Sequence, residues 1–232
     1  MRYLGGKFRL KKDIKQLISQ YRKPNQAFVS PFCGSCWIES ELENERLLYD
    51  KHYYLIEMWK AILNGWEPPQ NINEEEYQHI KTHLDENPAL SGFVGFVSSY
   101  GGKWFGGYAR GESRNFTKEG YGSVLRKAKK LKGATFNCAD FTTLQPQDAI
   151  IYCDPPYFGT TQYATNLLGK FDHSIFWDKA REWSKNNIVL VSEYQAPDDF
   201  ICIWEKAGKT DLKDSEHKPK NKIEKVFLKK PE

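Results

Sequence analysis

The sequence lacks the features of a membrane-inserted or secreted protein. None of its apolar runs approaches the roughly 20 residues that span a bilayer. Its basic N-terminus is not followed by the apolar stretch of a signal peptide. We therefore expect a protein that makes no membrane contact and works in the cytoplasm.

Paired metal-binding cysteines are also lacking. Of the five cysteines, at positions 33, 36, 138, 153 and 202, only Cys33 and Cys36 have the CxxC spacing. A structural zinc site normally needs a second such pair or a pair of histidines, so we expect no metal ion. A redox dithiol is the alternative that this spacing leaves open, and reduced thiols fit a cytosolic protein.

The sequence has no large excess of positive or negative charge, but its charged residues are unevenly distributed along the chain. The net charge is +4, yet residues 1–23 hold eight Lys/Arg against one acid, and residues 103–132 hold nine against two. Clustered basic segments in a balanced chain indicate a polyanionic partner; solvated basic faces are the alternative. Aromatic residues, at 15%, suit either base stacking or the filling of a core.

Apolar runs and turn signals alternate along most of the chain. A length of 232 residues allows one α/β domain with a small insertion. Strands are predicted at 27–29, 47–49, 134–137, 149–153, 188–191, 201–204 and 226–228. Helices are predicted at 10–21, from about Trp37, at 55–62 and after the capping residue Asp172. This alternation favours a parallel sheet with helical crossovers.

The alternation stops between residues 65 and 133. Gly-Gly pairs at 101–102 and 106–107, in an aromatic-rich stretch, replace it. We interpret residues 65–133 as an inserted helical and loop-rich module, called the insert below. Residues 1–64 and 134–232 then form the main domain.

The sharpest chemical signal is Asp154-Pro155-Pro156-Tyr157, directly after the apolar strand 149–153. Ligands of open parallel sheets bind at the carboxyl ends of the strands. The Asp154 carboxylate and the Pro155 carbonyl could each accept a hydrogen bond from one amino group, whose lone pair would stay free to attack a methyl group. Tyr157 could stack on the base that carries this amino group. A strand-ending Asp-Pro turn is the structural alternative.

A second signal is the loop Pro31-Phe32-Cys33-Gly34-Ser35 after the first predicted strand. Small residues let the backbone approach a ligand and aim the N–H groups of a following helix at it. The loop does not match GxGxxG, so a dinucleotide fingerprint is not indicated.

Further candidate residues follow other strands or stand at the N-terminus. Asp50 ends the second strand, where an acid can bind ribose hydroxyls. Asp140 and Phe141 follow the third strand and suit the amino group and ring of an adenine. Tyr3 and Lys7 belong to RYLGGK, in which Gly-Gly beside Lys suits a carboxylate or phosphate.

Together these segments resemble the Dam-type adenine-N6 DNA methyltransferases, including phage-encoded ones. The resemblance rests on residues 2–7, 30–35, 49–62, 93–111, 137–141 and 154–157, in the order typical of the alpha class. It implies a seven-stranded, mostly parallel S-adenosylmethionine-dependent methyltransferase sheet with helices on both faces. The insert would then recognise the DNA target.

The resemblance also implies roles for individual residues. The cofactor S-adenosylmethionine would contact Tyr3, Lys7, Pro31, Phe32, Cys33, Gly34, Ser35, Asp50, Asp140, Phe141 and Asp154. The catalytic set would be Asp154, Pro155, Pro156 and Tyr157. Three positions that bear on cofactor affinity depart from the family: Ser30, where Glu is usual, Cys36, where Gly is often found, and Tyr3, where Trp is frequent.

We therefore expect methyl transfer to the N6 amino group of an adenine flipped out of double-stranded DNA. Methylation of cytosine N4, RNA adenine or protein glutamine, and a catalytically silent DNA-binding module, are the alternatives. The cell would be bacterial or phage-infected. The sequence does not distinguish a restriction partner, phage self-protection and regulation, and it leaves the oligomeric state open, with a monomer as the working expectation.

Basic residues of the insert are the candidates for DNA contact. Lys103, Arg110, Arg114 and Arg126 lie in or beside its Gly- and aromatic-rich stretch. Such side chains neutralise the closely spaced phosphates of a duplex. We expect Arg110 and Lys103 on the DNA-facing surface, although Arg-containing Gly-rich loops are often merely solvated.

Overall fold

The computed structural model describes residues 1–160, 165–208 and 222–230. Within them, one seven-stranded sheet has the order β3-β2-β1-β4-β5-β7-β6. The strands are β1 (Ala27–Ser30), β2 (Arg46–Asp50), β3 (Ala134–Cys138), β4 (Ala149–Cys153), β5 (Ile188–Glu193), β6 (Phe200–Gly208) and β7 (Lys222–Lys229). The pairs formed by β1 to β5 are parallel, whereas β7 pairs antiparallel with both β5 and β6. The predicted mostly parallel methyltransferase sheet is confirmed.

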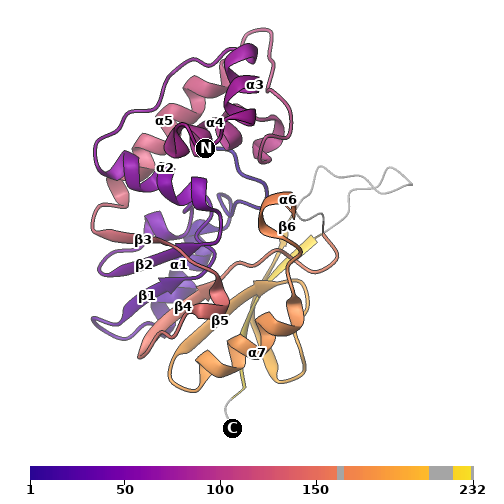
Figure 1. The fold of residues 1–232 in the computed structure, drawn as a ribbon. Helices are drawn as coiled ribbons and strands as arrows, with labels where there is room; N and C mark the ends of the chain where they lie inside the picture. The colour runs from indigo at the N-terminus through magenta and orange to yellow at the C-terminus, as the bar shows by residue number, and fades with distance from the viewer. Residues whose placement is uncertain (161–164, 209–221, 231–232) are drawn as a thin grey trace.

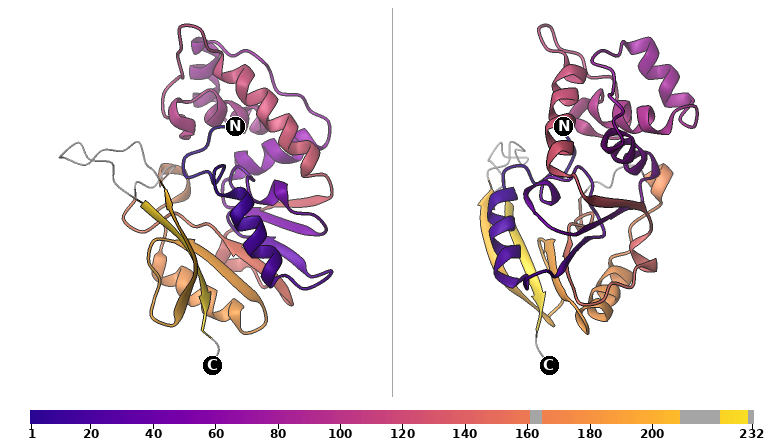
Figure 2. Two further views of the ribbon diagram at one scale, coloured as in Figure 1. Left: turned by 180° about the vertical axis from the view of Figure 1, so that it is seen from behind. Right: turned by 90° about the vertical axis from the view of Figure 1, so that its left-hand side faces the viewer.

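Helices cover both faces of this sheet (Figure 1 and Figure 2). The α-helices are α1 (Lys11–Tyr21), α2 (Tyr53–Leu63), α3 (Glu74–Thr82), α4 (Pro88–Val97), α5 (Phe116–Lys130), α6 (Thr165–Leu168) and α7 (His173–Ser184). Three short 3₁₀ helices are η1 (Glu39–Glu41), η2 (Tyr100–Gly102) and η3 (Phe141–Thr143). As predicted, Asp172 caps α7, because its carboxylate accepts the N–H groups of Ser174 and Ile175.

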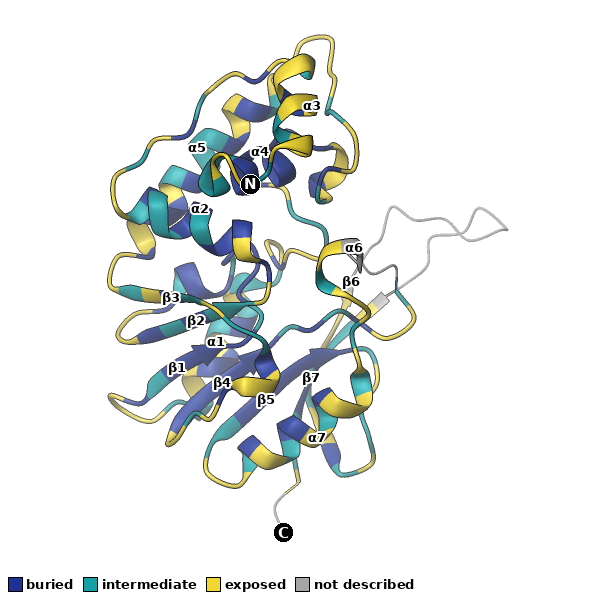
Figure 3. Ribbon diagram, viewed as in Figure 1, coloured by how far each residue is buried: buried dark blue, intermediate teal, exposed yellow. Residues whose placement is uncertain are grey.

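The two faces of the sheet bury separate apolar clusters. Every residue of β4 is buried (Figure 3), as expected for a central parallel strand. Ile150 and Tyr152 join the cluster that contains Ile14 of α1. Ile151 alternates to the opposite cluster, which contains Trp183 of α7. This alternation fixes the register of β4, because a one-residue slip would exchange its two faces.

The strand order reverses between β1 and β4. From β1 the chain proceeds outward to β2 and β3, whereas β4 continues on its other side to β5. The loops after β1, β2, β3 and β4 therefore leave the same carboxyl edge on both sides of a topological switch point. This is the place where open α/β sheets bind their ligands.

One predicted helix is wrong. The chain does not form a helix from Trp37; it forms a turn followed by the three-residue η1. Cys36, the residue before Trp37, has a left-handed backbone conformation with φ of 55° instead of the extended conformation typical of a residue that starts a helix. The loop after β1 is thus not followed by the α-helical N-terminus that was expected to aim N–H groups at a ligand.

The segment between α2 and β3 contains α3, α4 and α5, which stand beyond the carboxyl edge of the sheet (Figure 1). Glycines let α4 pack closely: a Cβ on Gly92 would lie 2.0 Å from the Tyr54 carbonyl oxygen of α2. The N-terminal segment runs along this layer, where the Leu4 N–H donates to the Gly102 carbonyl at 3.4 Å. The Met1 ammonium donates to the Ser123 hydroxyl of α5, so the N-terminus itself lies against these helices.

We predict opposite effects from two helical glycines. Gly92→Ala should lower the free energy of unfolding by about 1–3 kcal/mol, because the new methyl group meets the rigid backbone of α2. In α5, the methyl group of Gly122→Ala would meet only the flexible end of the Arg126 side chain, at 3.1 Å. This change should raise the free energy of unfolding by up to about 1 kcal/mol, because alanine has the higher helix propensity. Urea unfolding measures both; equal effects would contradict the close packing of α4.

Candidate active site

A cavity of about 250 Å³ lies at the carboxyl edge, over the ends of β1 to β4. All eleven residues predicted to contact the cofactor line it. They are Tyr3, Lys7, Pro31, Phe32, Cys33, Gly34, Ser35, Asp50, Asp140, Phe141 and Asp154. Of the predicted catalytic residues, Asp154 and Pro156 line the cavity, and Pro155 and Tyr157 do not.

Asp50 organises the loop after β1. Its carboxylate accepts the Gly34 N–H at 2.9 Å and the His52 N–H at 2.9 Å. Burial raises the pKa of Asp50 to about 6, although these two N–H groups counteract it. Gly34 has φ of +46°, and a Cβ there would press on the Tyr3 ring at 3.2 Å. This position therefore requires glycine both for its conformation and for its space.

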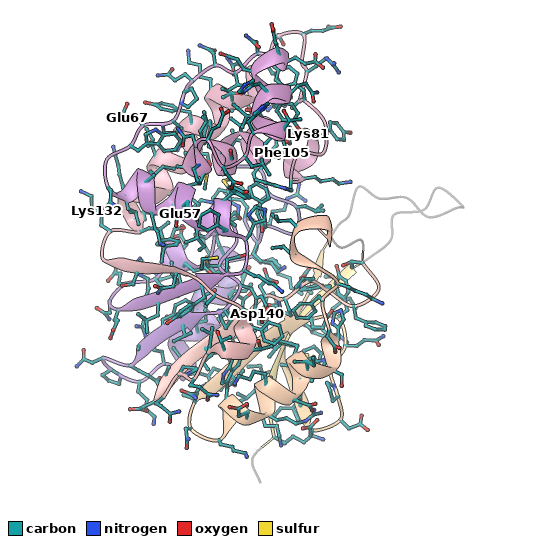
Figure 4. The ribbon with its side chains drawn as sticks, viewed as in Figure 1. Glu57, Glu67, Lys81, Phe105, Lys132 and Asp140 are labelled. Atoms are coloured by element: carbon teal, nitrogen blue, oxygen red, sulfur yellow. The ribbon has the colours of Figure 1, made fainter. Side chains whose placement is uncertain are left out.

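Aromatic side chains form the wall of the cavity near β3. The Phe32 and Phe141 rings lie 5.4 Å apart, and Phe171 lies 5.4 Å from Phe141. Asp140 accepts the Thr142 N–H at 3.0 Å and pairs with Lys51 at 2.9 Å. Although burial opposes it, these contacts lower the pKa of Asp140. This end of the cavity thus combines apolar rings with an ionised acid, at the edge where Figure 4 labels Asp140.

An ion pair between a buried lysine and a half-buried aspartate lies at another part of the cavity wall. The Lys7 ammonium lies 2.8 Å from an Asp154 carboxylate oxygen and 4.0 Å from Glu224 of β7. Burial raises the pKa of Asp154, and Lys7 offsets part of that effect. Burial alone would lower the pKa of Lys7, but the charges of Asp154 and Glu224 outweigh the effect of burial, so the pKa is raised. The pair joins the N-terminal segment to the loop after β4.

Tyr157 is held from several sides. Its hydroxyl donates to Glu224 at 2.9 Å, and its ring meets the Tyr194 ring edge to face at 4.6 Å. The Lys7 ammonium lies 4.5 Å from its ring centroid. The ring is therefore fixed beside Asp154 although it does not line the cavity.

Sequence analysis missed Glu193, the last residue of β5. Its carboxylate accepts the N–H groups of Phe158 at 2.9 Å and Tyr194 at 2.7 Å. Burial raises the pKa of Glu193 to about 7. Glu193 thereby fixes the loop that follows Tyr157. The sequence signal that could have found it was an acid two residues after the predicted strand 188–191.

Two further buried ionisable residues were missed beneath the loop after β1. Glu39 accepts the Ser30 hydroxyl at 2.8 Å and lines the cavity. Lys127 of α5 donates to the Ser35 carbonyl, and its ammonium lies 3.7 Å from the centroid of a Trp37 ring. Burial raises the pKa of Glu39 to about 7 and lowers the pKa of Lys127 to about 7. The unusual Ser30 was the only sequence signal pointing here.

The basic residues predicted to contact DNA lie outside the cavity. Lys103, Arg110, Arg114 and Arg126 are all exposed in the insert. Arg110 pairs with Glu74, and Arg114 pairs with Glu119 at 2.6 Å. These pairs are solvent-exposed and therefore weak.

Possible metal ligands do not gather at the cavity within the part of the chain that the structure describes. His79, His83 and Glu86 form the only group of three with suitable spacing there, and they are exposed in the insert. Among the described residues, no helix is long and apolar enough to cross a membrane.

The sequence matches the family of D12 class N6 adenine-specific DNA methyltransferases over residues 3–97 and 89–218. A DNA adenine methylase of Vibrio cholerae serotype O1 is 26% identical over 84% of this chain and 80% of its own. Among solved structures, a magnesium protoporphyrin IX methyltransferase from Synechocystis with bound S-adenosylmethionine is 8% identical over 98% of this chain and 81% of its own, with a TM-score of 0.42. A precorrin 8W decarboxylase from Methanobacterium thermoautotrophicum is 8% identical over 94% of this chain and 90% of its own, with a TM-score of 0.39.

The family match spans nearly the whole chain and includes the N-terminal motif, the loop after β1 and the Asp154 loop. Enzymes of this family depend on S-adenosylmethionine, as predicted for the cofactor. The chain therefore belongs to the D12 class N6 adenine-specific DNA methyltransferases.

Proposed function

We propose that this enzyme transfers a methyl group from S-adenosylmethionine, bound in the cavity at the β1/β4 switch point, to the N6 amino group of an adenine flipped out of duplex DNA. The observation that carries the proposal is the position of Asp154. Its half-buried carboxylate follows the central strand β4 and faces the same cavity as the loop after β1. An acceptor for the target amino group thus lies beside the proposed methyl donor.

The residues of the cavity fit S-adenosylmethionine chemically. Asp50 presents a carboxylate suited to the two ribose hydroxyls, at the end of β2. Phe32 and Phe141 offer apolar faces for the adenine ring, and Asp140 can accept from its amino group. Lys7 and Tyr3 line the other end, where they would contact the methionine portion. When bound, the cofactor supplies an electrophilic methyl group on its sulfonium.

The chain's own residues would hold the target nitrogen. Asp154 and the carbonyl of Pro155 would accept its two hydrogens, so that the lone pair stays free to attack. Tyr157 would stack on the base, and its contacts with Glu224 and Tyr194 fix the ring in advance. The adenine must leave the helix to reach this pocket, because its amino group is inaccessible within the stack.

Asp154→Ala should abolish methyl transfer while the protein stays folded. Loss of one positioning group costs about a hundredfold or more in rate, and Asp154 lies at a strand end rather than in the apolar core. Incorporation of tritiated methyl into duplex DNA gives the rate, and far-UV circular dichroism gives the fold. Asp178→Ala, an exposed change on α7, is the matched control. Retention of more than about a tenth of the rate would contradict the assignment.

Asp50→Ala should weaken binding of S-adenosylhomocysteine by about tenfold or more, because charge-assisted hydrogen bonds to the ribose are lost. Duplex binding should change little. Calorimetric titration measures the first and fluorescence anisotropy the second. An unchanged dissociation constant for S-adenosylhomocysteine would show that Asp50 only supports the loop through Gly34 and His52.

Lys103→Ala with Arg110→Ala should weaken duplex binding and flatten its salt dependence, because up to two phosphate contacts are lost. Each contact contributes about 0.9 to the slope of log affinity against log salt. Lys23→Ala with Lys185→Ala is the matched control: both lysines are exposed and precede strands β1 and β5, at the opposite edge of the sheet. If the Lys103→Ala, Arg110→Ala variant kept the duplex affinity and the salt slope of the unaltered protein, the DNA-binding surface would lie elsewhere, most simply on the basic N-terminal segment.

A further inference from the structure

Glu39 is a buried acid in the cavity wall to which the proposed mechanism assigns no task. Glu39 is 3% exposed, belongs to η1 and lines the cavity. One carboxylate oxygen accepts the Ser30 hydroxyl at 2.8 Å. A buried carboxylate facing a ligand cavity is costly unless the ligand or the protein balances its charge.

The sheet topology places Glu39 near the Asp154 end of the cavity. Ser30 ends β1, which lies beside β4. On the other side of β1, Asp50 ends β2 and Asp140 follows the end of β3 by two residues. The charge of Asp154 acts on Glu39 and contributes to its raised pKa. The acids suited to the adenosine portion thus lie at one end, and Glu39 lies toward the end where Lys7 and Asp154 meet.

The protein itself balances the charge of Glu39 only in part. Lys127 is the basic residue whose charge acts on it most, but the Lys127 ammonium is engaged with the Ser35 carbonyl and the Trp37 ring. The pKa of Glu39 consequently stays raised, at about 7, mainly through burial. A cationic hydrogen-bond donor from the ligand would complete the site.

We infer that Glu39 binds the α-ammonium group of the methionine portion of the cofactor. The inference rests on the proposed cofactor site. The cofactor has two cationic groups, and of these only the ammonium has N–H donors for a carboxylate; the sulfonium has none. In this chain η1 therefore supplies the carboxylate to the cavity, and the Ser30 hydroxyl orients it.

The test removes the carboxylate from the protein and, separately, the ammonium group from the ligand. Glu39→Gln keeps the shape and an acceptor for Ser30. S-adenosylhomocysteine carries the ammonium, and 5′-methylthioadenosine has the same adenosine and thioether without the amino-acid portion. Calorimetric titration of both ligands should show S-adenosylhomocysteine weakened by about tenfold to a hundredfold and 5′-methylthioadenosine unchanged.

The matched control is Glu41→Gln on the same 3₁₀ helix. Glu41 pairs with Lys11 at 2.7 Å and does not line the cavity, so both affinities should match those of the unaltered protein. If Glu39→Gln weakened the binding of both ligands equally, the inference would be overturned, because Glu39 would then act only in the structure of the loop. Unchanged binding of both ligands would overturn it as well. If the unaltered protein binds neither ligand, the proposed cofactor site itself fails, and this inference fails with it.

Discussion

The structure depends on how carboxylates are stabilised at the ends of buried strands. Asp154 is balanced by Lys7 at 2.8 Å, whereas Asp50 and Glu193 rely on backbone N–H donors. Burial costs each of these acids free energy, and the raised pKa values of Asp50 and Glu193, about 6 and about 7, express that cost. Of the three acids, Asp50 and Asp154 line the cavity and Glu193 does not, so two carboxylates are available there to accept hydrogen bonds from a ligand.

Lys7 also explains why the N-terminal segment is part of the site. It pairs with Asp154, while Leu4 in the same segment donates to Gly102 of the insert. Lys127 makes a second connection, from α5 of the insert to the Ser35 carbonyl. The loop that lines the proposed cofactor cavity is therefore held partly by the segment proposed to recognise DNA.

The sequence was sufficient to predict the elements whose signals are local. Apolar runs such as 149–153 predicted the strands, and the order of motifs after successive strands predicted which residues share the cavity. Glu39 and Lys127 were not predicted, because nothing local distinguishes a buried ionisable side chain from an exposed one. Their burial comes from packing between segments up to 92 positions apart, as in the contact of Lys127 with Ser35.

The helix that was wrongly predicted from Trp37 has a bearing on the same site. Instead of a helix, the left-handed turn at Cys36 leads into η1, where Glu39 reaches the hydroxyl of Ser30, nine positions earlier. A carboxylate carried directly at position 30 would need no such return. The unusual residues at 30 and 36 and the acid at 39 therefore form one physical unit: the turn delivers the carboxylate, and the small hydroxyl side chain leaves it room and a hydrogen bond.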